Sequence, residues 1–268
     1  MGVEEKNGPG YVVRGEGVPV LMLPGMEGCK EFWRNQLEGL SHRYRVVACD
    51  LARRRPALSS TMSDYAADAL RIMDSLGLEK AIVVGESFGG MVAQQLAIAH
   101  RERVLALVLC NTMDRQRRGG FGLNMFTLAT LVHQFAFLPF LSEAQRKRLL
   151  GWVGKHRGFI MDPSPGNADL VEYILEYGTA CGPGCYLDRM IAAGKIRFTD
   201  RLESISVPTL VLRGVEDRLV SPGTAVELAG RIPGAQTALI DGGGHCCPHT
   251  VPRATNEAIL RWLERVGY

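Results

Sequence analysis

The sequence predicts an α/β fold, in which a mostly parallel sheet of about six to eight strands is flanked by helices and interrupted by one helical insertion. Two observations carry this prediction. Short apolar runs alternate with longer amphipathic stretches over most of the 268 residues, which is typical of parallel strands joined by crossover helices. Between residues 113 and 201 the alternation stops, and the segment shows helical patterning without a convincing strand.

Six apolar runs have the length and composition of strands that are buried on both faces. They span residues 18–23, 44–49, 81–84, 104–110, 209–212 and 237–240. Helix-spaced apolar residues lie between and after them, at 31–40, 62–76, 91–100, 222–231 and 253–266. One sheet with crossover helices accounts for all of these segments.

The central segment reads as four short helices separated by prolines, at 121–141, 142–152, 167–177 and 186–193. A structureless loop of this length is uncommon in a compact domain. We therefore expect a core domain made of residues 1–112 and 202–268. Residues 113–201 are expected to form a helical cap, inserted after the strand that ends at Cys110.

Composition excludes several classes of protein. Apolar residues make up 46% of the chain, enough for a full core, and the balance of 31 Lys and Arg against 28 Asp and Glu is too even for a nucleic-acid partner. The first ten residues lack the features of a secretory signal, and no apolar run approaches the roughly 18 residues of a membrane span. We expect a cytoplasmic protein without a membrane span; its oligomeric state stays open.

The seven cysteines form an odd set, and Cys49 and Cys110 lie inside apolar runs. This pattern favours buried, reduced thiols over a disulfide framework. The motif CGPGC at residues 181–185 lacks a second pair of ligands at zinc spacing, so no metal site is expected there.

Glycine flanks a serine where the buried run 81–84 ends, in the stretch VVGESFGG. A very tight turn from strand to helix would force Ser87 into strained geometry, and side chains at Gly85 and Gly89 would collide with their neighbours. The helix that follows offers unpaired N–H groups that favour a developing negative charge. The stretch predicts an exposed nucleophile at Ser87.

A serine nucleophile needs a base, and the base works best when a carboxylate fixes its tautomer. Asp217 follows one predicted strand and His245 follows the next, so both lie at carboxyl ends. Three alternatives remain. Glu216 and Asp114 could replace Asp217 as the acid, and His249 is the other histidine near the predicted base.

An oxyanion hole needs two donors aimed at the oxygen that gains charge. The backbone N–H of Phe88, directly after the nucleophile, is expected to be one donor. The second is expected from the loop after the first strand, and we choose the backbone N–H of Met26.

Taken together, LPGMEG at 23–28, CDL at 49–51, VVGESFGGMVAQQLA at 83–97, LRGVEDRLVSP at 212–222 and GGGHCCPH at 242–249 resemble the α/β-hydrolase superfamily over almost the full chain. The resemblance implies a catalytic triad of Ser87, Asp217 and His245, no metal and no organic cofactor. It also implies that the cap selects the substrate. The stretch LVLCNT at 107–112 resembles maspardin-like proteins, in which the fold serves binding more than catalysis.

Two departures from the superfamily pattern stand out. Pro24-Gly25 occupies the position where many members carry His-Gly, which leaves the backbone donor of Met26 in place. The segment before Val18 is too short for the usual leading antiparallel hairpin, so we expect one or two edge strands to be missing.

The function expected from these residues is hydrolysis of a carboxylic ester through an acyl-enzyme on Ser87, with a small-molecule ester as the partner. Lactones, thioesters, amides and C–C bonds next to a ketone are alternatives, as is a non-catalytic receptor or adaptor of the same fold. Aromatic cap residues would suit a small to medium hydrophobic acyl group. The candidate pocket residues are Phe121, Phe126, Phe135 and Trp152.

Overall fold

The computed structural model describes residues 5–8, 10–26, 29–51, 59–115 and 182–268, together with single positions between 141 and 177. An eight-stranded sheet runs through these residues, in the order β1-β2-β4-β3-β5-β6-β7-β8. Its strands are β1 (Glu5–Gly8), β2 (Tyr11–Arg14), β3 (Pro19–Leu23), β4 (Arg45–Cys49), β5 (Ala81–Glu86), β6 (Val104–Cys110), β7 (Thr209–Gly214) and β8 (Gln236–Ile240). Strands β3 to β8 are parallel to one another, as predicted, and β2 is antiparallel to both of its neighbours.

The expectation of missing edge strands was wrong. β1 and β2 form an antiparallel hairpin in which Gly8 pairs with Tyr11, so only two residues turn the chain. Gly10, in this turn, has a φ of 87°, which glycine adopts without steric cost. Strands of four residues and a two-residue turn fit into the short leading segment, and β2 joins the hairpin to β4.

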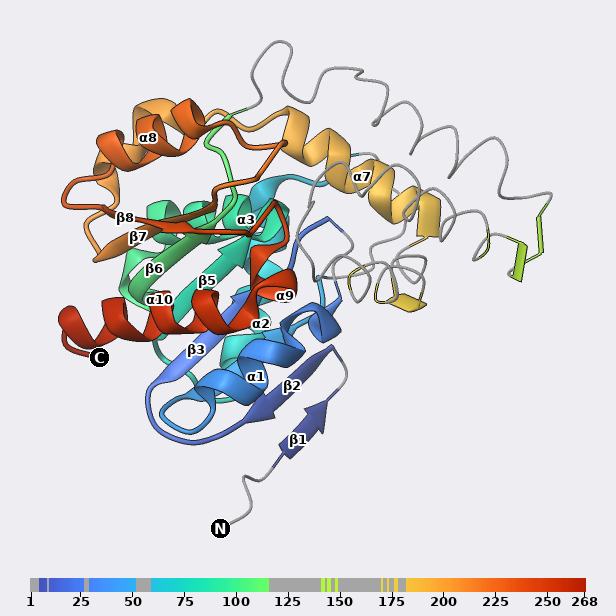
Figure 1. Cartoon of the computed structure of the whole chain (residues 1–268), viewed down its shortest axis with the longest axis horizontal. Helices are drawn as coiled ribbons and strands as arrows, with labels where there is room; N and C mark the ends of the chain where they lie inside the picture. Colours follow the sequence, from blue (N-terminus) through green and yellow to red (C-terminus); the bar gives the residue numbers. More distant parts are fainter. Residues whose placement is uncertain are drawn as a thin grey trace.

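Helices cover both faces of the sheet, with α1 and α10 in front and α2 and α3 behind in the view of Figure 1. The helical elements are η1 (Lys30–Trp33), α1 (Arg34–Leu40), α2 (Met62–Ser75), α3 (Phe88–Ala99), η2 (Arg101–Arg103), α7 (Gly182–Gly194), η5 (Thr199–Ser204), α8 (Pro222–Arg231), α9 (Cys247–Thr250) and α10 (Pro252–Arg265). Alternate side chains of each central strand pack against the helices on opposite faces of the sheet. In β3, Leu21 packs with the cluster that contains α2 and α3, while Met22 packs with the cluster that contains α1 and α10.

The order of the strands indicates where a ligand-binding site would lie. From β3 the chain moves through α1 to β4 on one side, and then through α2 to β5 on the other side of β3. Ligands of open α/β sheets bind outside the carboxyl ends of the strands at such a reversal of strand order. The loop after β3 and the turn after β5 meet at this point.

Two elements differ from the sequence expectation in informative ways. β5 continues to Glu86 and α3 begins at Phe88, three residues before the predicted start, so Ser87 alone makes the turn. β8 was predicted to be buried on both faces, but its residues alternate in burial and Leu239 is 66% exposed. Among the described residues, β8 is the last strand of the sheet order and has a neighbouring strand on one side only.

Candidate active site

Ser87 lies at the turn between β5 and α3 with φ 50° and ψ −114°, a backbone conformation that residues other than glycine rarely adopt. Two hydrogen bonds hold it there. Its N–H donates to the carbonyl oxygen of Cys110 at 2.9 Å, and the hydroxyl of Thr112 donates to the carbonyl oxygen of Ser87 at 2.6 Å. The end of β6 therefore fixes the strained turn.

The glycines on either side of Ser87 leave room for this turn, as the sequence predicts. A Cβ atom on Gly85 would fall on the backbone of Gly89 and Gly90, at the start of α3. A Cβ atom on Gly89 would fall on the backbone carbonyls of Leu23 and Pro24, at the end of β3. Because backbone atoms cannot move aside as a flexible side chain can, both positions require glycine.

A chain of hydrogen bonds joins three of the predicted residues. Ser87 Oγ lies 2.9 Å from His245 Nε2, and His245 Nδ1 lies 3.0 Å from Asp217 Oδ2. The imidazole and the carboxylate are both buried, with relative exposures of 4% and 5% for the two residues. The second carboxylate oxygen of Asp217 accepts the backbone N–H groups of Leu219 and Val220 at 2.8 and 3.0 Å, so Oδ2 is held toward the imidazole.

The alternative residues lie in other surroundings. Glu216 is exposed, and its backbone N–H donates to the carbonyl oxygen of Gly243. Asp114 accepts hydrogen bonds from the hydroxyl of Thr199 and the guanidinium of Arg115.

His249 is buried in α9, with its ring 5.7 Å from that of Phe32 and 5.0 Å from that of Tyr173, measured between ring centroids. The hydrogen-bonded chain thus contains Asp217 and His245 rather than these alternatives.

Met26 and Phe88, the predicted oxyanion-hole residues, both border Ser87. Phe88 is the first residue of α3, where helix N–H groups have no intrahelical acceptor. A Cβ atom on Gly25 would lie 3.6 Å from Ser87 Cβ, which places the Gly25–Met26 peptide beside the nucleophile. The backbone N–H groups of Met26 and Phe88 are therefore candidates for the two donors of an oxyanion hole.

Two further residues at this site were not singled out from the sequence. The carboxylate of Glu86 is buried, with Oε1 3.5 Å from His245 Nε2. Asn111 has a φ of 47°, accepts the N–H of Gly214 at 2.8 Å, and donates to the carbonyl oxygen of His245 at 2.6 Å. A polar residue at the end of a buried strand is the signal that could have identified either of them.

Burial changes the chemistry of the thiol next to this site. It raises the pKa of Cys110, at the end of β6, well above its ordinary value, and the charges of Cys247 and Glu86 act in the same direction. Burial likewise raises the pKa of Cys49. The thiols of Cys49 and Cys110 are therefore protonated and poorly nucleophilic at neutral pH.

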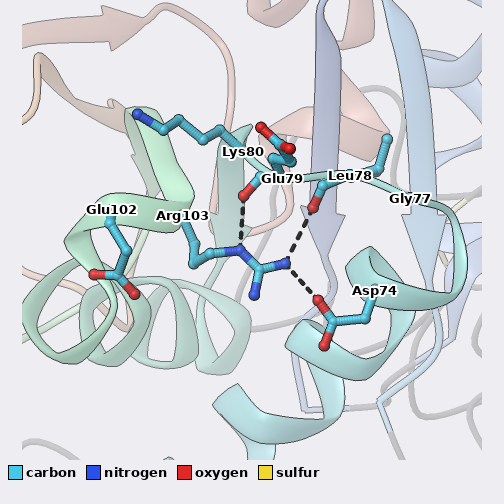
Figure 2. Close-up of a pocket in the computed structure, with 7 residues that line it drawn as sticks. All are labelled: Asp74, Gly77, Leu78, Glu79, Lys80, Glu102 and Arg103. Carbon is cyan, nitrogen blue, oxygen red and sulfur yellow. Dashed lines mark hydrogen bonds and ion pairs between the residues drawn. The ribbon is translucent and has the colours of Figure 1, made fainter.

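The predicted pocket residues Phe121, Phe126, Phe135 and Trp152 lie outside the described residues. A hollow of about 630 Å³ does occur in the described part of the chain, at the opposite end of β5. Figure 2 shows its lining, where the guanidinium of Arg103 donates to Asp74 and to the carbonyl oxygens of Leu78 and Glu79. Ser87, at the other end of the strand, is not part of it.

The fold and the site define the class of protein. The family model described as alpha/beta hydrolase fold matches residues 18–250, and the chain belongs to this family. No helix among the described residues has both the length and the apolar character needed to cross a bilayer.

Particular relatives are similar over nearly the whole chain. A protein of Azorhizobium caulinodans named "Putative carbamate hydrolase RutD" is 30% identical over 256 residues, which cover 93% of this chain and 92% of the relative. The solved structure of a thermophilic esterase from Thermogutta terrifontis, with malate bound, is 26% identical with a TM-score of 0.74, covering 99% of this chain and 98% of the other. The enol-lactonase from Burkholderia xenovorans LB400 has a TM-score of 0.72 at 20% identity, covers 95% of each chain, and shows the shared fold.

Proposed function

We propose that this protein is a serine hydrolase that cleaves a carboxylic ester with a small to medium, fairly hydrophobic acyl group. The observation that carries the proposal is the buried chain of hydrogen bonds from Ser87 through His245 to Asp217, with distances of 2.9 and 3.0 Å. A serine hydroxyl is a weak nucleophile until a base within hydrogen-bond reach can take its proton. His245 Nε2 is at that distance.

In the acylation step, Ser87 Oγ attacks the ester carbonyl carbon while its proton passes to His245 Nε2. Asp217 accepts the N–H at Nδ1, which keeps Nε2 available as a base and stabilises the imidazolium that forms. The carbonyl oxygen becomes an oxyanion, bound by the N–H groups of Met26 and Phe88. Collapse of the tetrahedral intermediate breaks the C–O bond, and the alcohol leaves with the proton from Nε2.

In the deacylation step, water occupies the place of the departed alcohol. His245 takes a proton from this water as its oxygen attacks the acyl carbon, and the same two N–H groups bind the second oxyanion. When the intermediate collapses, the bond to Ser87 Oγ breaks and Nε2 returns the proton to Oγ. The carboxylic acid leaves, and the enzyme is restored.

The similarity to the Thermogutta terrifontis esterase, which is 26% identical over nearly the full length, supports an ester as the first substrate class. A carbamate is the second candidate, because the relative at 30% identity is named as a carbamate hydrolase. The chemistry at Ser87 is the same for both, since a carbamate carbonyl is also attacked to give a tetrahedral intermediate. The substrate class then depends on whether the site accepts a carbon or a nitrogen substituent on the carbonyl carbon.

Labelling with a fluorophosphonate probe tests the nucleophile. We expect the wild-type protein and a Ser75→Ala control to be labelled, because the Ser75 hydroxyl is exposed and bonded within its own helix. We expect Ser87→Ala to remain unlabelled. Folded wild-type protein that resists the probe would overturn the hydrolase and favour the non-catalytic receptor.

A substrate panel tests the bond and the acyl group. We expect hydrolysis of p-nitrophenyl acetate and butyrate to have a higher kcat/KM than that of the decanoate. p-Nitrophenyl N-alkylcarbamates, which share the leaving group of the esters, form the matched arm of the panel, and lactones, thioesters and diketones form the others. A preference for long acyl chains contradicts the proposed size, and turnover confined to the carbamates replaces the ester with the second candidate.

A further inference from the structure

Helix α7 lies near the end of the expected cap, residues 113–201, and packs against the core. Ala192 and Ala193 are each 1% exposed and pack in the hydrophobic cluster shared with α2 and α3. The same helix buries two adjacent charged residues, Asp188 at 0% and Arg189 at 1% exposure. Charged side chains are seldom buried this fully, and burying them adds little to stability. Their contacts therefore call for another explanation.

Arg189 joins two loops that leave the sheet at its carboxyl edge. One guanidinium nitrogen donates to the carbonyl oxygen of Met26 at 2.7 Å, and the other donates to the carbonyl oxygen of Leu51 at 3.3 Å. Met26 follows β3 and Leu51 follows β4. The guanidinium therefore fixes the position of the residue that provides one of the two proposed oxyanion donors.

Asp188 acts on the other donor through one intermediate side chain. Its Oδ2 accepts the hydroxyl of Tyr65 at 3.0 Å, and its Oδ1 accepts the N–H of Ser60 at 3.3 Å. The ring of Tyr65 meets the ring of Phe88 edge to face, with centroids 5.0 Å apart and an interplanar angle of 89°. Asp188 thus orients the ring that packs against the first residue of α3.

We infer that Asp188 and Arg189 are positioning residues, which together hold the backbone donors of Met26 and Phe88 at the spacing that an oxyanion requires. The inference rests on the proposed function, since it assigns these N–H groups to the oxyanion. Such donors are effective only when they are fixed before the reaction, to within about 0.5 Å. Two adjacent residues of one helix reach both halves of the hole, so a displacement of α7 would disturb both donors at once.

The test compares Arg189→Met with Arg197→Met. Methionine keeps an unbranched apolar stem, although it is shorter than arginine, and removes the donors to Met26 and Leu51. Arg197 is exposed, lies just beyond the same helix, and donates to the carbonyl oxygens of Gly194 and Ile196, so it is the matched control. With p-nitrophenyl butyrate we expect Arg189→Met to lower kcat roughly 10- to 100-fold, less than the loss of a whole oxyanion donor, with KM within about twofold.

A transition-state analogue separates positioning from general loss of structure. An alkyl boronic acid forms a tetrahedral anion on Ser87, so we expect its affinity to fall by the same factor as kcat in Arg189→Met. Arg189→Lys, which keeps a donor, should recover part of the kcat and part of the boronate affinity. It also replaces Arg189→Met in the test if that variant fails to fold. Tyr65→Phe, which removes the hydrogen bond to Asp188 but keeps the ring, should lower kcat by a smaller factor. Unchanged kcat and boronate affinity in a folded variant at Arg189 would overturn the inference.

Amide hydrogen exchange makes the inference testable apart from activity. We expect the segments that contain Met26 and Phe88 to exchange faster in Arg189→Met than in Arg197→Met, while β6 exchanges equally in both. If the wild-type protein is neither labelled by a fluorophosphonate nor active on any ester, the proposed function fails. Exchange then still decides whether Arg189 holds the loop, and equal exchange in the two variants would contradict that.

Discussion

The two ends of β5 lie beside close pairs of polar side chains in opposite surroundings. At the amino edge, Arg103 and Asp74 lie 2.6 Å apart, and their side chains are 23% and 62% exposed. At the carboxyl edge, His245 and Asp217 lie 3.0 Å apart, and their side chains are 5% and 0% exposed. Water screens the first pair, whereas the second lies where electrostatic interactions are strong.

A short contact beside a hollow in the surface is therefore not sufficient evidence for an active site. The hollow at the amino edge has volume and charge, but the guanidinium of Arg103 is occupied in tying α2 and the following loop to the start of β6. At the carboxyl edge the buried pair ends on a hydroxyl held in strained geometry. Chemistry is expected where the groups are desolvated and directed at one atom.

The largest effect is expected on the rate of hydrolysis, which should fall at the carboxyl edge only. Asp217→Asn should lower kcat/KM for p-nitrophenyl butyrate by about 10³- to 10⁴-fold, because an amide does not hold the imidazole in the required tautomer. Asp74→Asn, at the amino edge, should leave the rate within about twofold, because its partner is screened by water. If Asp217→Asn keeps a rate within about tenfold of wild type, another acid orients His245.

The second comparison concerns glycines. Gly89→Ala should lower the free energy of unfolding by about 2–3 kcal/mol and abolish fluorophosphonate labelling, because a Cβ atom there collides with the backbone at the end of β3. Gly77, at the amino edge, has a φ of 66° and open space around it, so Gly77→Ala should cost only about 1 kcal/mol, from its dihedral angle. Urea unfolding measures both, and equal costs would contradict the tight turn at Ser87.

The third prediction compares Asn111 at the carboxyl edge with Arg103 at the amino edge. Asn111→Ala leaves the buried N–H of Gly214 and the carbonyl oxygen of His245 without this side chain, which should cost about 1–3 kcal/mol of stability and lower kcat through a looser His245 loop. Arg103→Met, which removes an equally connected residue at the amino edge, should cost about 1 kcal/mol or less and leave kcat unchanged. Urea unfolding measures the stability of both variants, and steady-state kinetics measure their kcat. A larger loss of kcat in Arg103→Met than in Asn111→Ala would reverse the roles assigned to the two edges.

The smallest effect is expected from thiol reagents. Iodoacetamide reacts with the thiolate, and the raised pKa of Cys110 leaves little of this residue in the thiolate form at pH 8. We therefore expect Cys110 to stay unmodified in the folded protein. The half-buried thiol of Cys185, on α7, should be alkylated without loss of activity. Peptide mass spectrometry in the presence and absence of denaturant measures both. Modification of Cys110 in the folded protein would show that the carboxyl edge opens to solvent.

Much of the core fold was predictable, because its signals are local. Apolar periodicity placed β3 to β8 in the right stretches of sequence, and the spacing of Gly85, Ser87 and Gly89 indicated a tight turn before any contact was known. Loops that follow neighbouring parallel strands meet at one edge, so the positions of Asp217 and His245 after two strands predicted that they would lie near Ser87. Local patterns failed for the leading hairpin, where four-residue strands are too short to leave a clear signal.

Local sequence patterns were enough to predict the alternation of strands and helices, the sharp turn at Ser87 and the edge of the sheet where polar residues gather. The tertiary structure was needed to show that Asp217, and not Asp114 or Glu216, lies against His245. It was also needed to show that Asn111 and Glu86 contact His245 and that Arg189 contacts the loop at Met26. Periodicity and turns act over a few residues, whereas these contacts join residues up to 163 positions apart, and their distances depend on how every layer between them packs.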